Sequence, residues 1–482
     1  MRRIGLKAAL LACAALGAAP AQGETLKEAL IAAYTTNPQL EAARANLRAT
    51  DEGEVIQRAG GLPSLSTSGN FTEFLKSSSS SFIAPERSLS ANVDLSVPIY
   101  SGGSVRNGIH AARNRVEAGR ADLRGTESAI FAQVVAAYMD VILNEAIVGL
   151  STRNVEVLTV NLEATSDRFE IGELTRTDVA QSESRLALAR TDLRSSQANL
   201  ISARENYIAL VGMAPGELDA PPPLPGLPEG PDDAVDVALE YNPDLLAARE
   251  RAEASGYDIE VAGAGRLPTL SAFASGGYQD YLGTLGSIPG QTAADQTSTT
   301  AQAGLRLSLP IFQGGRVAAQ QRQAQAQSSA ALEQAIATER SVIAQVRAAF
   351  SSWRAANAII ASTQSAVDAA ELSLEGVRAE NSIGNRTILE VLNAEQELLA
   401  ARVQLVTARR NAYVAGFSLL AAMGRAEARD LGLEGDVPLY DPVANYDRSR
   451  SILIDWHSDP DPIATSTSTV DIPAQDGEIP AE

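Results

Sequence analysis

Residues 171–179 read Ile171-Gly172-Glu173-Leu174-Thr175-Arg176-Thr177-Asp178-Val179, and a related stretch follows as Ile383-Gly384-Asn385-Arg386-Thr387-Ile388-Leu389-Glu390-Val391. A glycine among polar residues predicts a tight turn in both places. Each turn leads into a helical pattern in which one row of residues recurs every seven positions. The first row is Val179, Leu186, Leu193, Leu200 and Tyr207, and the second is Val391, Leu398, Leu405, Ala412 and Leu419. We therefore predict a turn followed by a long packed helix, present twice.

Alanines follow the second row at a constant distance of three positions. They are Ala394, Ala401, Ala408, Ala415 and Ala422. Such a row of small side chains lets a partner helix approach closely, and the seven-residue repeat keeps one seam against that partner. The composition agrees, because 45% of the residues are hydrophobic but only 5% are aromatic. The chain suits slender, closely packed helices.

Short motifs of the first half return in the second half with one spacing. Asn37-Pro38 is matched by Asn242-Pro243, and Leu62-Pro63 by Leu267-Pro268, each pair 205 positions apart. The same spacing for both pairs of motifs within one chain indicates an internal duplication. We expect a leader at 1–21, a first repeat at 22–213, a proline-rich linker at 214–233, a second repeat at 234–425 and a C-terminal segment at 426–482, with disorder from Ser449 onward.

Strands are predicted where apolar and polar residues alternate, at 88–100 and 301–312. Each has an upstream partner, at 65–75 and 270–281, so two hairpins result. Their strands have about the 9 to 11 residues with which a tilted strand crosses a bilayer. A soluble sandwich would show the same alternation, but four strands separated by long helices cannot form a sandwich core. Closure by several identical chains would remove the unpaired edges.

Long helices are predicted at 104–168 and 316–380, since both stretches lack proline and carry apolar residues at helical spacing. At 1.5 Å per residue, such helices reach roughly 100 Å. The shorter helices expected at 25–58 and 178–210 together have a similar length. We therefore expect one continuous helix beside one built of two pieces in each repeat.

The N-terminus has the features of an export signal. Basic residues at Arg2 and Arg3 precede an apolar run at 8–19, and Ala19-Pro20-Ala21 fits cleavage after Ala21. Acylation of Cys13 after lipoprotein-type cleavage is the alternative. No later stretch approaches the 18 or so apolar residues of a membrane helix.

Several classes of protein are disfavoured by composition. A net charge of -20 argues against binding to nucleic acid. Cys13 is the only cysteine, and His110 and His457 are the only histidines, so disulfides, thiolate zinc sites and imidazole clusters are excluded. The sequence contains no nucleophile elbow and no phosphate loop. We expect that the protein is not an enzyme and that it binds no cofactor.

Taken together, the duplicated motifs resemble the TolC family of outer-membrane efflux proteins of Gram-negative bacteria, over roughly 25–425. The resemblance implies a homotrimer in which each chain gives four strands to a 12-stranded β-barrel in outer-membrane lipid, above a periplasmic α-barrel. It implies a channel of tripartite efflux or type I secretion systems that passively exports drugs, small molecules or proteins. Its partners would be a periplasmic adaptor and an RND, ABC or MFS transporter of the inner membrane. The alternative is a coiled-coil structural protein or adhesin that spans the envelope without forming a channel.

The resemblance also assigns the two glycine turns to a periplasmic gate. Asp178 and Glu390 match acids that surround the opening, and Arg386 matches an arginine that holds the closed state. Asn393 stands where a second acid is typical, and Asn381 where a tyrosine is typical. Capping of a helix N-terminus is the other role open to Asp178 and Glu390. Contact with the adaptor is expected at Ile171, Gly172, Glu173, Leu174, Ile383, Gly384, Asn385 and Arg386.

Overall fold

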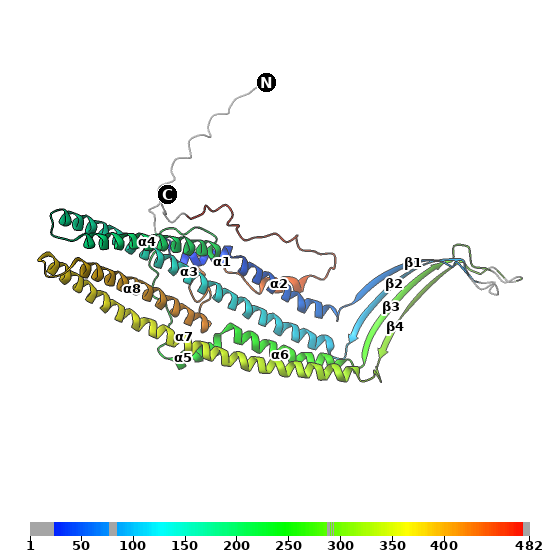
Figure 1. The fold of residues 1–482 in the computed structure, drawn as a ribbon. Coiled ribbons are helices and arrows are strands. Elements are labelled where there is room, and N and C mark those ends of the chain that lie inside the picture. The colour runs from blue at the N-terminus through cyan, green and yellow to red at the C-terminus, as the bar shows by residue number, and fades with distance from the viewer. Residues whose placement is uncertain (1–23, 77–83, 287–289, 291, 293, 476–482) are drawn as a thin grey trace, which may run out of the picture.

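The computed structural model describes residues 24–76, 84–286, 290, 292 and 294–475. The expected signal peptide lies outside the described residues, as does the serine-rich stretch at 77–81 between the first two predicted strands. Long helices lie side by side over most of the molecule, and four strands extend from one end of them (Figure 1).

The two repeats contain the same elements in the same order. The first consists of α1 (Leu26–Thr36), α2 (Pro38–Ala59), β1 (Ser64–Glu73), β2 (Arg87–Tyr100), α3 (Ser104–Glu170) and α4 (Arg176–Val211). The second consists of α5 (Pro231–Tyr241), α6 (Pro243–Ala264), β3 (Thr269–Asp280), β4 (Thr297–Ser308), α7 (Arg316–Ser382) and α8 (Ile388–Ala422). A short helix, α9 (Ala444–Ser451), follows. The predicted order of helices and strands is confirmed, and α3 and α7 have 67 residues each.

The two Asn-Pro bends explain how short helices stack end to end beside a long one. Asn37 caps α2 through its side-chain oxygen, which accepts from two N–H groups of the first turn. Its Nδ2 donates to the carbonyl oxygen of Leu210 at the end of α4, at 3.0 Å. Asn242 caps α6 by accepting from one N–H group, that of Leu245, and its Nδ2 donates to the carbonyl oxygen of Ala422 at the end of α8, at 2.9 Å. Each asparagine therefore joins the pieces that run along α3 or α7.

The strands form one antiparallel sheet in the order β1-β2-β3-β4. The β2–β3 pair joins the two repeats, with Val93 opposite Gly276. The second-repeat strand that we predicted at 301–312 is wrong by about four residues, because β4 ends at Ser308. Pro310 lacks the N–H that a continued ladder requires. In the first repeat, β2 continues past Pro98 to Tyr100, with an irregular register against β3 at that point.

The seven-residue rows form the seams inside the hairpins. Val391, Leu398 and Leu405 are buried against α7 together with their neighbouring alanines. Leu186, Leu200 and Tyr207 of the first row are buried as well, whereas Val179 and Leu193 are half-buried. The prediction of a packed seam is therefore confirmed in both repeats.

The largest apolar core surrounds the middle of α3. Phe131, Tyr138 and Tyr207 are fully buried there, among residues of α1, α4 and the segment after α8. By length and composition alone, α3 is the one helix among the described residues that could cross a membrane, which the sequence patterns did not lead us to expect. Its buried apolar side chains belong to this core instead.

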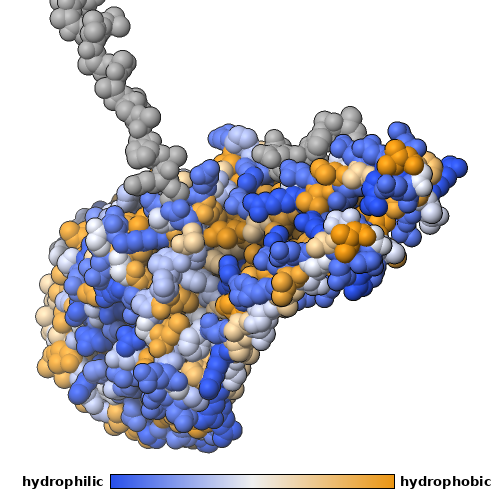
Figure 2. Space-filling model, turned by 90° about the vertical axis from the view of Figure 1, so that its left-hand side faces the viewer, coloured by the Kyte–Doolittle hydropathy of each residue, from blue (hydrophilic) through white to orange (hydrophobic). Residues whose placement is uncertain are grey.

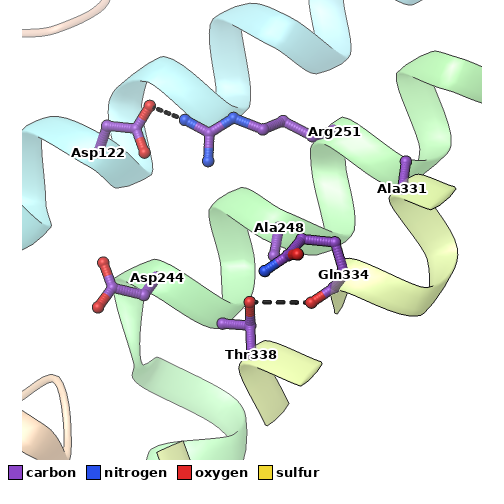
Figure 3. A pocket seen from close by; sticks show the side chains of 7 residues that line it. All are labelled: Asp122, Asp244, Ala248, Arg251, Ala331, Gln334 and Thr338. Atoms are coloured by element: carbon purple, nitrogen blue, oxygen red, sulfur yellow. Dashed lines mark hydrogen bonds and ion pairs between the residues drawn. The ribbon is translucent and has the colours of Figure 1, made fainter. Parts of the chain in front are cut away.

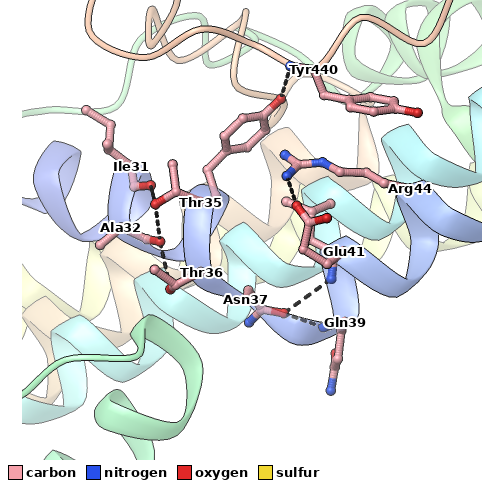
Figure 4. Close-up of polar contacts among 11 residues, drawn as sticks. Ile31, Ala32, Thr35, Thr36, Asn37, Gln39, Glu41, Arg44 and Tyr440 are labelled. Carbon is pink, nitrogen blue, oxygen red and sulfur yellow. Dashed lines mark hydrogen bonds and ion pairs between the residues drawn. The ribbon is translucent and has the colours of Figure 1, made fainter. Parts of the chain in front are cut away.

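The C-terminal segment packs on the first repeat. Tyr440 donates its backbone N–H to the Tyr34 hydroxyl at 2.8 Å, beside Arg44 and the Asn37 bend (Figure 4). Disorder was expected from Ser449 onward, but Ser449 is buried against α2. Residues 452–475 form no helix or strand, and Gln475 nevertheless donates its N–H to Glu205 of α4 at 3.2 Å. The remaining residues, 476–482, lie outside the described part of the chain.

Candidate functional site: the paired turns

Both glycine turns have the backbone conformation that the sequence predicts. Gly172 and Gly384 have φ angles of 80° and 81°, in the left-handed region that side chains disfavour. The turns connect α3 to α4 and α7 to α8, at the end of the molecule opposite the strands (Figure 1). Sequence alone therefore located two equivalent turns, and the fold brings them to one end.

Each turn is followed by a capping box. Thr175 accepts from the N–H of Asp178, and the Asp178 carboxylate accepts from the Thr175 N–H at 2.8 Å. Thr387 and Glu390 repeat this arrangement, also with a 2.8 Å bond to the Thr387 N–H. The capping role that we considered for both acids is confirmed. Two orphan N–H groups are satisfied in each helix, which fixes where α4 and α8 begin.

The capping bonds also keep both acids charged. Hydrogen bonds from the Thr175 side chain and backbone lower the pKa of Asp178. The Thr387 N–H, the Arg386 guanidinium and the Thr387 hydroxyl lower the pKa of Glu390 to about 2. Fixed negative charges therefore stand at the heads of α4 and α8 at any pH near neutrality.

Arg386 is held within its own hairpin. Its guanidinium contacts Glu380 of α7 and Glu390 of α8, each at 2.6 Å. Asn381 donates its side-chain N–H to the Arg386 carbonyl oxygen at 2.8 Å. The first turn has a simpler pair, Arg168 with Glu173 at 3.1 Å. Arg386 thus links both sides of the second turn, and Asn381 braces its backbone.

Asn393 lies above the turn and contacts the other hairpin. Arg185 of α4 donates to Asn393 at 2.8 Å and to Gln396 at 2.5 Å. Beside these bonds, Leu392 packs in an apolar cluster with Leu158 of α3 and with α4 residues. Asn393 therefore serves as an acceptor between the two hairpins.

Glu395 is the residue that sequence reasoning missed. Its side chain is only 6% exposed, and both carboxylate oxygens accept from Asn161 of α3, at 2.9 and 3.0 Å. Arg378 of α7 donates to it at 2.9 Å. A signal was present, since Glu395 stands four positions after Val391 and three before Leu398, on the face of the seam. A charge at such a position requires partners.

The tips themselves present apolar side chains to solvent. Ile171 is 72% exposed and Ile383 is 71% exposed. Figure 2 looks at the molecule from the end that carries the turns and shows a curved subunit with a hollowed side, on which polar and apolar residues are mixed. The turn residues are therefore free to contact another molecule.

Away from the turns, a shallow hollow lies between α3, α6 and α7 (Figure 3). Asp122 and Arg251 form an ion pair at its edge, and Thr338 bonds to the backbone of Gln334. The hollow is lined by Asp122, Asp244, Ala248, Arg251, Ala331, Gln334 and Thr338. Among the described residues, no group of three or more histidines, cysteines, aspartates and glutamates could hold a metal ion.

Four membrane-length strands at one end, and two turn-headed helical hairpins at the other, define a subunit of an outer-membrane channel with a large periplasmic portion. The chain belongs to the outer membrane efflux protein family, whose model matches residues 30–213 and 234–425. The family consists of channel proteins rather than enzymes.

Individual relatives agree with this assignment. The chain is 33% identical over 439 residues to the outer membrane efflux protein BepC of Brucella suis biovar 1 (strain 1330), covering 91% of this chain and 93% of the relative. It is 31% identical over 319 residues to the outer membrane protein TolC of Escherichia coli (strain K12), covering 63% of each. The fold is similar to the crystal structure of VceC from Vibrio cholerae, with a TM-score of 0.71 and 24% identity over 83% of this chain and 96% of that one.

Proposed function

We propose that three copies of this chain form an exit duct whose periplasmic end is closed by the paired turns. Each copy gives four strands to a 12-stranded barrel in outer-membrane lipid, which pairs the free edges of β1 and β4. The duct passively exports drugs, small molecules or proteins, and it catalyses no reaction. It docks to a periplasmic adaptor and, through it, to an inner-membrane transporter of the RND, ABC or MFS class.

One observation carries the gate assignment. Asp178 and Glu390 head equivalent helices at the same end of the molecule, and both are held ionised by capping bonds. Three copies would bring six such helix ends together. In this closed end Arg386 neutralises Glu390, while Asn381 and Asn393 hold the second turn and the start of α8 in place.

Conductance of the purified protein in a planar bilayer tests the gate. Arg386→Ala removes the link between Glu380 and Glu390, so we expect a larger conductance than that of the unmodified channel. The matched control is Arg402→Ala, which removes an ion pair of similar exposure with Glu371, farther along the same hairpin. Equal conductance in both variants and the unmodified channel would place the gate elsewhere, and no conductance from a folded protein would favour a structural coiled-coil role.

The adaptor contact is tested by crosslinking in cells. We expect photocrosslinkers at Ile171 and Ile383, and at Glu173, Leu174 and Asn385 beside them, to capture a periplasmic adaptor, whereas Gly172 and Gly384 are left unchanged because a side chain there would strain the turn. Leu372 of α7 provides the control because it is 72% exposed but lies away from the turns. Capture of the same protein from Leu372 alone would move the docking surface off the turns.

A further inference from the structure

The C-terminal segment carries an apolar loop that the channel function does not explain. Its position depends on the direction of α9 along α2. Asn445 near the start of α9 donates to Asp51 at 2.8 Å, whereas Arg450 near its end accepts from Arg58 through its carbonyl oxygen. The two helices therefore run parallel, and α9 points toward the sheet as α2 does.

Buried charges fix α9 in this place. Asp51 and Glu54 of α2 are completely buried. Glu54 pairs with Arg113 of α3 at 3.1 Å and with Arg450 at 3.5 Å. Because an unpaired buried carboxylate is strongly unfavourable, the acids of α2 require the partners that α9 supplies. The helix is therefore a firm base for the loop at its C-terminal end.

The chain beyond α9 forms a closed loop, which we call the arm loop (452–458). The Asp459 carboxylate accepts from Arg448 at 2.7 and 2.8 Å and so brings the chain back to α9. Between these ends, His457 donates its N–H to the Ile454 carbonyl oxygen at 3.1 Å. The arm loop therefore projects from the end of α9 that faces the strands.

The arm loop exposes three large apolar side chains within four positions. Leu453 is 71% exposed, Ile454 is 69% exposed and Trp456 is 95% exposed. A cluster of this kind on a folded surface marks a contact with a partner or a membrane.

The ends of the strands next to the helices carry exposed apolar side chains, which we call the apolar belt. α2 ends at Ala59 and β1 begins at Ser64, so the intervening residues span at most about 14 Å. Exposed apolar side chains lie at the helix-side ends of the strands in both repeats, namely Leu65, Ile99 and Tyr100 in the first repeat and Ile311 and Phe312 after β4 in the second. In membrane barrels, aromatic residues are typical of the two levels at which the barrel meets the membrane–water interface. The arm loop lies beside α2 near the periplasmic side of this belt.

We propose that the arm loop inserts Leu453, Ile454 and Trp456 into the headgroup region of the periplasmic leaflet of the outer membrane. A tryptophan flanked by aliphatic residues suits that region, because its ring is apolar and its N–H finds polar partners there. The anchoring of α9 on α2 transmits this contact to the helices directly below the barrel. The inference depends on the outer-membrane location and not on the proposed gate.

Fluorescence of Trp456 in reconstituted protein tests the contact. The chain has two tryptophans, so the Trp353→Phe variant reports Trp456 alone, and the difference between the unmodified protein and Trp456→Phe gives the same signal should Trp353→Phe misfold. In vesicles of phosphatidylethanolamine and phosphatidylglycerol, we expect emission at shorter wavelength than in water. We also expect stronger quenching by a nitroxide near the lipid headgroup than by one at the chain end.

A displaced tryptophan gives the control. Val470→Trp, combined with Trp353→Phe and Trp456→Phe, places the probe at an 82% exposed position of the same segment. That part of the chain lies far from the strands, since Thr467 lies against Gly212 at the end of α4. We expect no lipid quenching there. A shifted emission of Trp456 without lipid quenching would assign the loop to a neighbouring subunit, and emission as in water would leave it in solvent; either result overturns the proposal.

Discussion

Asn161 of α3 donates its side-chain amide to both carboxylate oxygens of Glu395 in α8, at 2.9 and 3.0 Å. The contact joins the first hairpin to the second, and Arg378 neutralises the buried charge from α7. Together with the bonds of Arg185 to Asn393 and Gln396, it forms a polar seam just above the turns. The relative position of the two hairpins is therefore set by side chains outside the turns themselves.

Loss of the Asn161–Glu395 contact should loosen the start of α8. We expect Glu395→Ala to lower the free energy of local opening by about 1–3 kcal/mol, because Asn161 and Arg378 lose their shared acceptor. Hydrogen exchange of the α8 amides measures this opening. The single variants and the Asn161→Ala/Glu395→Ala double variant form a cycle in which we expect non-additive effects. Glu397→Ala, an exposed neighbour, is the control, and equal effects of Glu395→Ala and Glu397→Ala would contradict the assignment.

Two glycines of the second hairpin should respond to alanine with opposite signs. Gly384→Ala forces a side chain into the left-handed region and should destabilise the turn by about 1–2 kcal/mol. Gly376→Ala lies within α7, where an added Cβ meets nothing within 4 Å, and should stabilise the helix by about 0.5–1 kcal/mol. Thermal unfolding of both variants measures the difference. A stabilising effect at Gly384 would mean that the turn relaxes into another conformation.

Asn37 and Asn242 each cap a helix through the side-chain oxygen and donate to another helix through Nδ2. Replacement by aspartate separates these two roles. Asn242→Asp keeps the oxygen that caps α6 but removes the donor to Ala422. We expect it to lower the free energy of unfolding by about 1–3 kcal/mol, because a carboxylate then faces a carbonyl oxygen. Thermal unfolding measures the loss, and Asn37→Asp should behave alike because its donor contact with Leu210 is equivalent. An unchanged stability in both variants would show that the cap alone carries the bend.

Glu127 should make the folded protein less stable as pH rises toward 7, whereas Glu390 should not. Burial raises the pKa of Glu127 to about 6, against the opposing hydrogen bond from the Ala428 N–H. The folded protein therefore binds this proton before the unfolded chain does, as pH falls from 7 to 4. The contribution to stability is fully present below the unfolded pKa and is lost as pH rises through about 6, with a magnitude of about 2 kcal/mol.

Comparison with Glu127→Gln isolates this effect. We expect the variant to be more stable than the unmodified protein at pH 7 and to lose that advantage by pH 4, as measured by thermal unfolding. Glu390 has the opposite sign, since its pKa is lowered to about 2 and its contribution is lost only as pH falls below the unfolded value. A constant difference between the Gln variant and the unmodified protein at all pH values would contradict the role of Glu127.

The sequence by itself determined the local features. The capping boxes at Thr175 and Thr387, the glycine turns and the alternating strands each depend on residues within a few positions of one another. Their spacing was therefore readable without coordinates, and the duplication repeated each signal. The repeated Asn-Pro motifs likewise indicated the duplication.

Only the tertiary structure decided which distant groups meet. Asn37 and Leu210 are separated by 173 positions, and Asn161 and Glu395 by 234. A polar side chain on a long helix has the same local pattern whether it faces solvent, another hairpin or α9. Its partner is fixed by the packing of whole helices, which no short window of sequence contains. For that reason the turns could be predicted from the sequence. The polar seam and the packing of α9 on α2 became visible only in the tertiary structure.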